Sequence, residues 1–211
     1  MDLNFSIVNA LNIGMSKYIK KIYKDFPEEI KSAKGTPVAK HLFNVREDNL
    51  DKMIPNEQEQ AFHHTTAQLL FLCTHAQPDI KTAVSFLCTR YKTPDEDNWG
   101  KLKRVLKYLY GTRHMKLCLT VDSLHTLPWW VDASYAVHWD SRSHTGMVML
   151  MGLGAAMSGG LQQKLNTSSS TEAELVGIND ELCYIMWGLY FIQAQDCEVT
   201  KNVGTLANRY I

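Results

Sequence analysis

The sequence has no excess charge of either sign, since 22 lysine and arginine residues balance 22 aspartate and glutamate residues. A net charge of zero gives the whole chain no general attraction to nucleic acid or to an anionic membrane. The charges are nevertheless spread unevenly. Residues 1–121 hold 18 cations and 13 acids, whereas residues 122–211 hold 4 cations and 9 acids. This asymmetry predicts two units with different roles, 1–121 and 122–211.

Long apolar runs and paired cysteines are also missing. No stretch approaches the roughly 18 apolar residues of a membrane-spanning helix, and the N-terminal residues lack a signal-peptide pattern. The five cysteines are scattered and include no Cys-x-x-Cys pair, which favours reduced thiols over a disulfide frame or a zinc site. We therefore expect an intracellular protein, in the cytoplasm or the nucleus, with no membrane partner.

Several common catalytic motifs are absent. The sequence contains no Gly-rich phosphate-binding loop, no Walker lysine and no Gly-x-Ser-x-Gly elbow. None of its eight histidines forms a His-x-x-x-His or a His-Glu-x-x-His arrangement. We expect no small-molecule substrate.

The residues that are present predict a mostly helical first half. Residues 1–14 suggest a strand pair that turns near Asn9, and hydrophobic spacing predicts helices at 17–26, at about 56–76 and from Pro78 onward. The clearest helix follows, with Thr93 as the expected N-cap, Pro94 at the first helical position, Glu96 completing a capping box and Gly111 placed to end it.

Six cations lie on and just after this helix, with no acid between 101 and 116. Two interpretations stay open: a solvated outer face of the helix, or a surface that contacts nucleic-acid phosphates. The six residues are Lys101, Lys103, Arg104, Lys107, Arg113 and Lys116.

The second half predicts strands at 117–121, 127–132 and 145–151, a turn at 152–154 and a short strand at 155–158. A long helix should run from about Ser170 to Gln195, because Ser169-x-x-Glu172 and Thr171-x-x-Glu174 are overlapping capping boxes. The expected fold class is α+β or α/β. The predicted buried stripe of the long helix comprises Leu175, Ile178, Leu182, Ile185, Met186 and Leu189.

Two acids stand out by position. Asp132 ends the apolar run Leu-Pro-Trp-Trp-Val-Asp, where a carboxylate is costly unless it is exposed, paired or bound to metal. Glu174 lies in the first turn of the long helix, where the helix dipole favours an acid. An aspartate at a strand end and a glutamate in a capping box are the simpler interpretations, and local physics does not decide between these and a metal site.

Several motifs in order along nearly the whole chain resemble one family. They are Phe62-His-His-Thr-Thr-Ala-Gln-Leu-Leu-Phe-Leu72, Gln77-Pro-Asp-Ile-Lys-Thr-Ala-Val-Ser-Phe-Leu87, Trp99-Gly-Lys-Leu-Lys-Arg-Val-Leu-Lys-Tyr-Leu-Tyr-Gly-Thr112, Val131-Asp-Ala-Ser, Ser143-His-Thr-Gly146 and Ser169-Ser-Thr-Glu-Ala-Glu-Leu175. Together they resemble the C-terminal part of a copia-type retrotransposon Pol polyprotein. The resemblance implies a mostly helical thumb and connection region of a reverse transcriptase at 1–121, and a truncated RNase H domain at 122–211 with an incomplete mixed sheet and a long helix.

The resemblance implies catalytic roles for two of the acids and a gap at a third. Asp132 matches the first catalytic aspartate and Glu174 the catalytic glutamate, and in the family such acids hold Mg²⁺. The third acid of the family falls on Ala207. The polymerase Tyr-x-Asp-Asp motif has no counterpart, because the sequence contains no Asp-Asp dipeptide, so the chain is not expected to polymerise DNA.

The resemblance therefore implies a polyprotein fragment whose ancestral activity, the hydrolysis of RNA in RNA–DNA hybrids, is lost. An alternative is a non-catalytic module that binds an RNA–DNA hybrid or a template–primer duplex through the cations at 101–116. A further alternative is an active nuclease in which Asp180 or Asp196 replaces the third acid.

Overall fold

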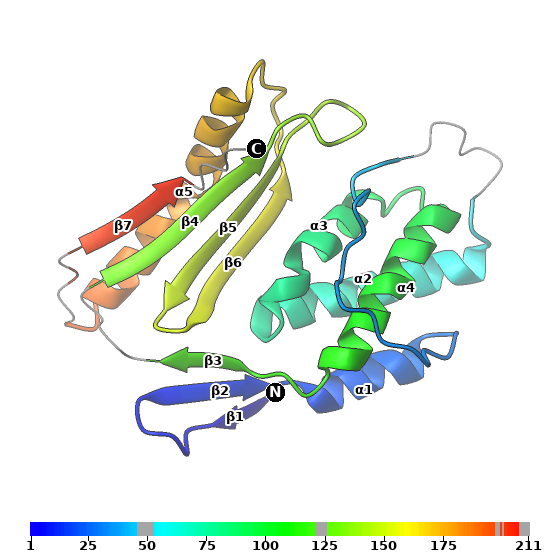
Figure 1. Ribbon diagram of the computed structural model, residues 1–211, viewed down its shortest axis with the longest axis horizontal. Helices are drawn as coiled ribbons and strands as arrows, with labels where there is room; N and C mark the ends of the chain where they lie inside the picture. Colours follow the sequence, from blue (N-terminus) through cyan, green and yellow to red (C-terminus); the bar gives the residue numbers. More distant parts are fainter. Residues whose placement is uncertain (46–52, 121–125, 197–198, 200, 207–211) are drawn as a thin grey trace. The chain divides into compact units, whose positions relative to one another are not determined.

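The computed structural model describes residues 1–45, 53–120, 126–196 and 199, and the backbone of 201–206. The chain divides into two compact units. The first unit comprises residues 1–2 and 13–116, and the second comprises residues 3–12 and 117–211. Helices and strands mix in the proportions of an α+β fold (Figure 1), which confirms the coarse fold class. The described part of the chain contains no helix with the length and apolarity that crossing a bilayer requires.

The first unit is built from helices. They are α1 (Ser16–Asp25), α2 (Asn56–His75), the 3₁₀ turn η2 (Pro78–Ile80), α3 (Lys81–Thr89) and α4 (Glu96–Thr112). Residues 26–45 connect α1 toward α2 without regular structure. The apolar faces of the helices enclose one buried cluster, in which Phe62, Leu72, Phe86 and Leu106 are fully inaccessible to solvent.

Helix α4 begins later and ends later than the sequence predicts. Asp95, not Thr93, is the N-cap, and its Oδ1 accepts a hydrogen bond of 2.7 Å from the Asn98 backbone N–H. A carboxylate in this position accepts a hydrogen bond from a free amide of the first turn, and its negative charge is stabilised by the positive end of the helix dipole. Gly111 does not end the helix, because Thr112 continues it and Arg113 keeps right-handed helical angles.

The second unit contains a four-stranded mixed sheet in the order β6-β5-β4-β7. The strands are β4 (Thr126–Ser134), β5 (His144–Met151), β6 (Gly154–Gln162) and β7 (Lys201–Leu206). β5 runs antiparallel to both β4 and β6, whereas β7 runs parallel to β4. The parallel pair is joined by α5 (Ser170–Gln193), as a parallel connection requires a crossover. β6 is longer than the predicted strand at 155–158.

A second, three-stranded sheet has the order β1-β2-β3. It contains β1 (Asp2–Asn4), β2 (Ala10–Gly14) and β3 (Leu117–Thr120), so the predicted strand pair at 1–14 is confirmed. β3 approaches β6 closely, since a Cβ atom at Gly154 would lie 2.2 Å from the Cys118 carbonyl oxygen. Cys73, Cys88, Cys118 and Cys183 are free thiols, and Cys197 lies outside the described residues.

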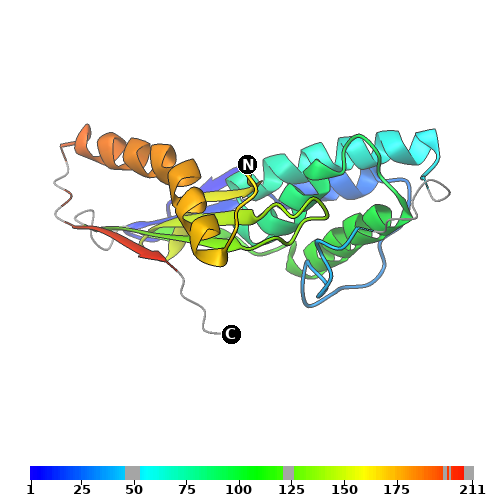
Figure 2. The ribbon, with the colours of Figure 1, turned by 90° about the horizontal axis from the view of Figure 1, so that it is seen from above.

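Helix α5 covers one side of the four-stranded sheet (Figure 2). Its start is as predicted, because the Ser169 hydroxyl accepts from the Glu172 N–H at 3.2 Å. Its predicted buried stripe is wrong in part, since Leu175 and Leu182 are exposed. Small residues face the sheet and let the helix approach it, as Gly177 lies over Thr145 and Ala133, and Gly188 over Met149. The buried positions are Ala173, Gly177, Glu181, Ile185, Gly188 and Ile192.

Candidate functional site

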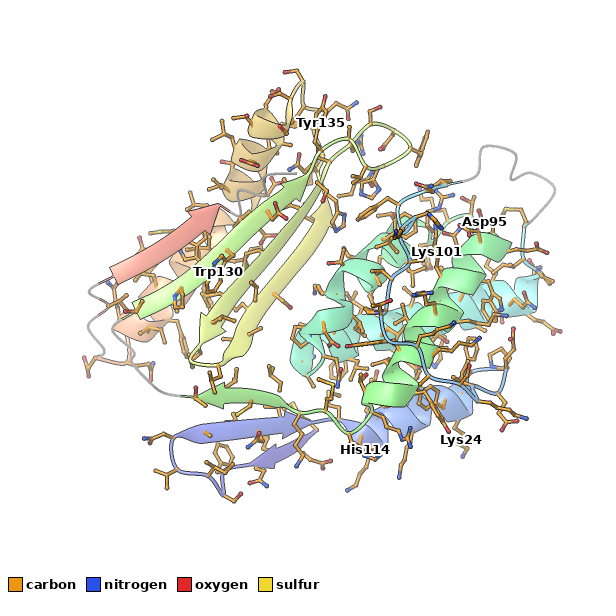
Figure 3. All side chains as sticks on the ribbon, in the orientation of Figure 1. Lys24, Asp95, Lys101, His114, Trp130 and Tyr135 are labelled. Atoms are coloured by element: carbon orange, nitrogen blue, oxygen red, sulfur yellow. The ribbon has the colours of Figure 1, made fainter. Side chains whose placement is uncertain are left out.

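Asp132 lies near the C-terminal end of β4 and is exposed to solvent. In the β4–β5 register it faces Gly146, and a Cβ at Gly146 would meet no described atom within 4 Å. Strand alternation places Asp132 and Trp130 on one face of the sheet, and Val131 and Ala133 on the face that α5 covers. Figure 3 shows Trp130 on the same strand. The Asp132 carboxylate is therefore accessible, and its exposure removes the cost of burying a charge.

Glu174 is the fifth residue of α5, just past the first turn in which the sequence predicts it, and is half-buried. The helix crosses β4 one turn later, where a Cβ on Gly177 would lie 3.6 Å from the Ala133 Cβ and 3.2 Å from the Thr145 hydroxyl. Since Ala133 follows Asp132, the two acids belong to the same end of the packing between α5 and β4. Their side chains start from different sides of the sheet, because Asp132 is on the face of β4 that α5 does not cover.

Hydrogen bonds fix this end of the helix to the sheet. The buried Gln163 amide donates to the Thr145 hydroxyl at 2.9 Å and to the Ala173 carbonyl at 2.8 Å. The Ser143 hydroxyl lies 3.3 Å from that of Thr167 and accepts from the Ala136 N–H at 3.1 Å. The backbone that carries Asp132 and Glu174 is thus held by buried polar contacts on both sides.

The third acid position falls outside the described residues. Leu206, the last described residue of β7, pairs with Val131, the residue before Asp132. Ala207 follows it in the sequence. Within the described residues, no group of three or more histidine, cysteine, aspartate or glutamate side chains has the arrangement of a metal site. Two carboxylates fit Mg²⁺ only in part, because Mg²⁺ demands six oxygen ligands and keeps most of its waters when few are supplied.

The two substitute acids considered from the sequence follow Glu174 along the chain. Asp180 is half-buried and one of its carboxylate oxygens is inaccessible to solvent. It follows Glu174 by six residues, a rise of about 9 Å along the helix. Asp196 lies past the end of α5, exposed and with a positive φ of 58°. Neither position adds to a three-acid cluster among the described residues.

A buried histidine pair near Asp132 was not anticipated from the sequence. His144 faces Ser134 across the β4–β5 ladder, and its Nδ1 lies 3.1 Å from Nε2 of His138. Burial, together with the neighbouring His138, lowers the pKa of His144 to about 4, and burial also lowers the pKa of His138. Both rings are therefore neutral at pH 7. Histidines six residues apart form no recognisable motif, and only the β-hairpin brings them together.

Glu181 is a second unanticipated residue. It is 1% exposed on the face of α5 that packs on the sheet. The carboxylate lies over Gly159 of β6, where a Cβ would be 2.5 Å from one oxygen. Because Gly159 has no side chain, the Glu181 carboxylate fits between α5 and β6. The apolar periodicity of α5 hides this residue, because it favours larger apolar residues for the buried face.

The cations of α4 are neither a fully solvated face nor a free basic stripe. Lys101 pairs with Asp97 at 2.9 Å and donates to the Asn44 carbonyl at 2.6 Å. Lys103 pairs with Glu28 at 3.1 Å. Burial raises the pKa of Glu28, but hydrogen bonds from the Trp99 indole and from Lys103 outweigh it, and the pKa falls.

The remaining predicted cations differ in setting. Arg104 donates to the Thr36 hydroxyl at 2.8 Å, and Lys107 is half-buried beside the same segment. The Arg113 guanidinium lies 4.6 Å from the centre of the Tyr110 ring, and Lys116 is exposed. Four of the six cations thus lie under residues 28–45, and two lie beyond the helix.

Comparison with known proteins identifies relatives of the chain. It is 28% identical over 191 residues to the retrovirus-related Pol polyprotein from transposon TNT 1-94 of Nicotiana tabacum, covering 86% of this chain and 14% of that protein. It is 27% identical over 189 residues to a transposon Ty5-1 protein of Saccharomyces cerevisiae, covering 88% and 59%. A third relative, the retrovirus-related Pol polyprotein from transposon RE2 of Arabidopsis thaliana, is 31% identical over 112 residues, covering 53% and 8%.

The chain is a relative of retrotransposon Pol polyproteins. This confirms the resemblance that the motifs carry. The chain spans less than two thirds of the length of each of these three relatives. No protein-family model matches the sequence, and no solved structure matches it.

Proposed function

We propose that the second unit is an RNase H-like unit of a retrotransposon Pol polyprotein that has lost most or all of its ability to cleave RNA in RNA–DNA hybrids. The observation that carries the proposal is the placement of Asp132 and Glu174. Asp132 lies two residues before the end of β4, the strand that α5 crosses, and Glu174 lies near the start of α5, one turn before the crossing at Gly177. Support for the loss of activity comes from Ala207, which stands where the resemblance implies a third acid.

Bound Mg²⁺ would supply activation of a water molecule and stabilisation of the leaving 3′ oxygen. Asp132 and Glu174 would be the protein ligands, and Glu174 would also lie toward the RNA 2′-hydroxyl by which such enzymes distinguish RNA from DNA. With only two carboxylates, which start from opposite faces of the sheet, the protein would leave one metal without its main ligand. Weak Mg²⁺ binding and little or no cleavage follow.

A cleavage assay with a third-acid variant tests the proposal. Purified full-length chain is incubated with a labelled RNA–DNA hybrid in Mg²⁺ or Mn²⁺. We expect no cleavage above that of Asp132→Ala. Ala207→Asp should restore measurable cleavage, because it returns the missing carboxylate. Asn208→Asp adds the same charge at the next residue and serves as the matched control.

Two outcomes would overturn the proposal in different ways. Cleavage by the unmodified chain that Asp132→Ala abolishes would show that the activity survives. Cleavage that Asp132→Ala leaves intact would remove the assignment of the site altogether. Equal effects of Ala207→Asp and Asn208→Asp would show that added charge, and not a ligand position, is responsible.

A non-catalytic module that binds hybrid or template–primer duplex is the second candidate. Exposed Lys116 and nearby Arg113 favour it, because both lie outside the contacts that occupy Lys101 and Lys103. Each phosphate contact would lower the logarithm of the binding constant by about 0.9 per decade of salt. Titration of hybrid at several salt concentrations therefore tests this candidate, and salt-independent binding would contradict it.

A further inference from the structure

A basic hollow lies in the first unit between α4 and residues 34–45. Its volume is about 670 Å³, within the range of small-molecule sites. The irregular segment is fixed over α4 at three points. The Lys34 N–H donates to the Lys107 carbonyl at 3.2 Å, Arg104 donates to Thr36, and Lys101 donates to the Asn44 carbonyl. Figure 3 shows Lys101 extending from α4 toward this segment. The hollow is thus a defined feature of the fold.

The charges that line the hollow are strongly unequal. Five cations and a single acid, Asp97, contribute to the lining. Asp97 is paired with Lys101, and Lys103 is paired with Glu28. Among the described residues, no carboxylate lies within 4.0 Å of the charged nitrogens of the other three cations, although Glu28 acts on Lys107 from farther away, so the hollow keeps an excess of positive charge. These three are Lys34, Arg104 and Lys107.

Arg104 offers a specific unused hydrogen bond. Its Nε is buried and has no hydrogen-bond partner within the described part of the chain, although one terminal nitrogen donates to Thr36. Buried donors are nearly always satisfied in folded proteins. The guanidinium suits two oxygens of a phosphate group better than a single acceptor. The Nε is inaccessible to solvent in this conformation, so an oxygen-rich anion in the hollow would be met by the terminal nitrogens of the guanidinium.

Gly100 is a second, independent sign of a ligand. It lies on the wall of the hollow, and a Cβ there would meet no described atom within 4 Å. Packing within the protein therefore does not explain a glycine inside α4, where it costs about 1 kcal/mol relative to alanine. Gly100, Lys103, Arg104 and Lys107 follow helical spacing and share one face. The absence of a side chain leaves room for a ligand against the helix backbone.

We propose that the basic hollow binds a compact polyphosphate anion of two or three linked phosphate groups. The face of α4 from Gly100 to Lys107 is about 10 Å long, which suits a short chain of phosphates better than an extended duplex. Lys34, Arg104 and Lys107 contact the phosphates, and Gly100 admits them to the helix surface. This site lies in a different unit from Asp132 and Glu174 and does not rest on the function proposed for them.

Isothermal titration of the full-length chain with inorganic tripolyphosphate tests the proposal at about 0.15 M salt. We expect saturable one-to-one binding, with orthophosphate at least about tenfold weaker. Arg104→Gln with Lys107→Gln should weaken binding by about tenfold or more, since two charge-assisted contacts are lost. Lys20→Gln with Lys24→Gln removes the same charge from the exposed side of α1, outside the hollow, and should change binding less than about twofold.

Gly100→Leu keeps every cation and fills the hollow. It should also abolish binding, while the better helix former stabilises α4, so misfolding would not explain the loss. Unchanged binding in Gly100→Leu, equal loss in both double variants, or no saturable binding by the unmodified chain would each overturn the proposal. An RNA–DNA hybrid that binds in a Gly100-sensitive manner when tripolyphosphate does not would also overturn it, and would assign the hollow to backbone phosphates.

Discussion

The two units bury their apolar residues very differently. In the first unit, 21 described residues form one continuous buried cluster from four helices and the segments that join them. In the second unit, where the side chains of β7 are outside the described part, the main cluster of described residues contains five, Leu127, Val131, Met147, Met149 and Ile185. Stability grows with the apolar surface removed from water. The comparison indicates that the first unit is held by its core, and that the second depends more on its sheet ladder and buried polar contacts.

The two units also differ in exposed apolar surface, which in the second unit lies on the outer side of α5. This helix is apolar almost all round, which is usual for helices buried on every side. Several large side chains on its outer surface are nevertheless exposed, and the rings of Trp187 and Phe191 stack on one another at 5.3 Å. The second unit thus combines a small core with exposed apolar surface.

The largest expected effect lies in the core of the first unit. Phe62→Ala should reduce the free energy of unfolding of this unit by about 3–5 kcal/mol, because the fully buried ring leaves a cavity. Urea unfolding, monitored by the hydrogen exchange of individual segments, gives the free energy of unfolding of each unit separately. Phe71→Ala, on the exposed side of the same helix, is the matched control and should cost less than about 1 kcal/mol. Similar losses in both variants would contradict the comparison.

An intermediate effect should follow acidification and concern the second unit. The pKa of His144 is about 4 in the folded chain, against the ordinary histidine value of 6.5 that applies in the unfolded chain. The unfolded state therefore binds more protons between these values, and stability falls as the pH drops from 6.5 to 4. The loss reaches about 3 kcal/mol at most. Four of the five tryptophans belong to this unit, so fluorescence-detected unfolding reports mainly on it.

His144→Gln should flatten this pH dependence, whatever its effect on stability at pH 7. The exposed His114→Gln in the first unit should leave the slope unchanged. A slope that survives in His144→Gln would assign the acid sensitivity to other groups.

The start of α5 was predictable because its signal is local. Ser169 and Glu172 lie within one turn, and their hydrogen bonds do not depend on the rest of the fold. The start of α4 was harder to predict, because Thr93 and Asp95 both have side chains that can cap a helix. Only the backbone conformation of the folded chain selects Asp95. The class of fold followed from periodicity, which needs no tertiary contact.

The buried face of α5 could not be predicted in the same way. Large apolar residues occur on all sides of the helix, so periodicity does not distinguish the inner face, and the small residues Ala173, Gly177 and Gly188 select it by allowing close approach. Asp132 and Glu174 were identified through family resemblance alone. The buried His138–His144 contact depends on the β4–β5 hairpin, which brings the two rings together. The basic hollow depends on residues 34–45, which lack periodicity, closing over α4.

The smallest effect on stability, with a clear effect on association, should come from the outer surface of α5. Trp187 is 57% exposed and Phe191 49% exposed, so replacing both by glutamine removes little buried surface and should change the free energy of unfolding by less than about 1 kcal/mol. Exposed apolar surface of this kind drives association. Sedimentation velocity should show concentration-dependent oligomers of the unmodified chain, and fewer for the double variant.

Tyr18→Gln with Phe71→Gln removes two aromatic rings in contact, at 5.4 Å, from the first unit and is the control for aromatic content. If association comes from α5, only the Trp187 and Phe191 variant reduces it. A monodisperse unmodified chain with one sharp thermal transition would contradict the comparison itself. It would mean that the second unit, in which five described residues form the main core cluster, is as self-contained as the first.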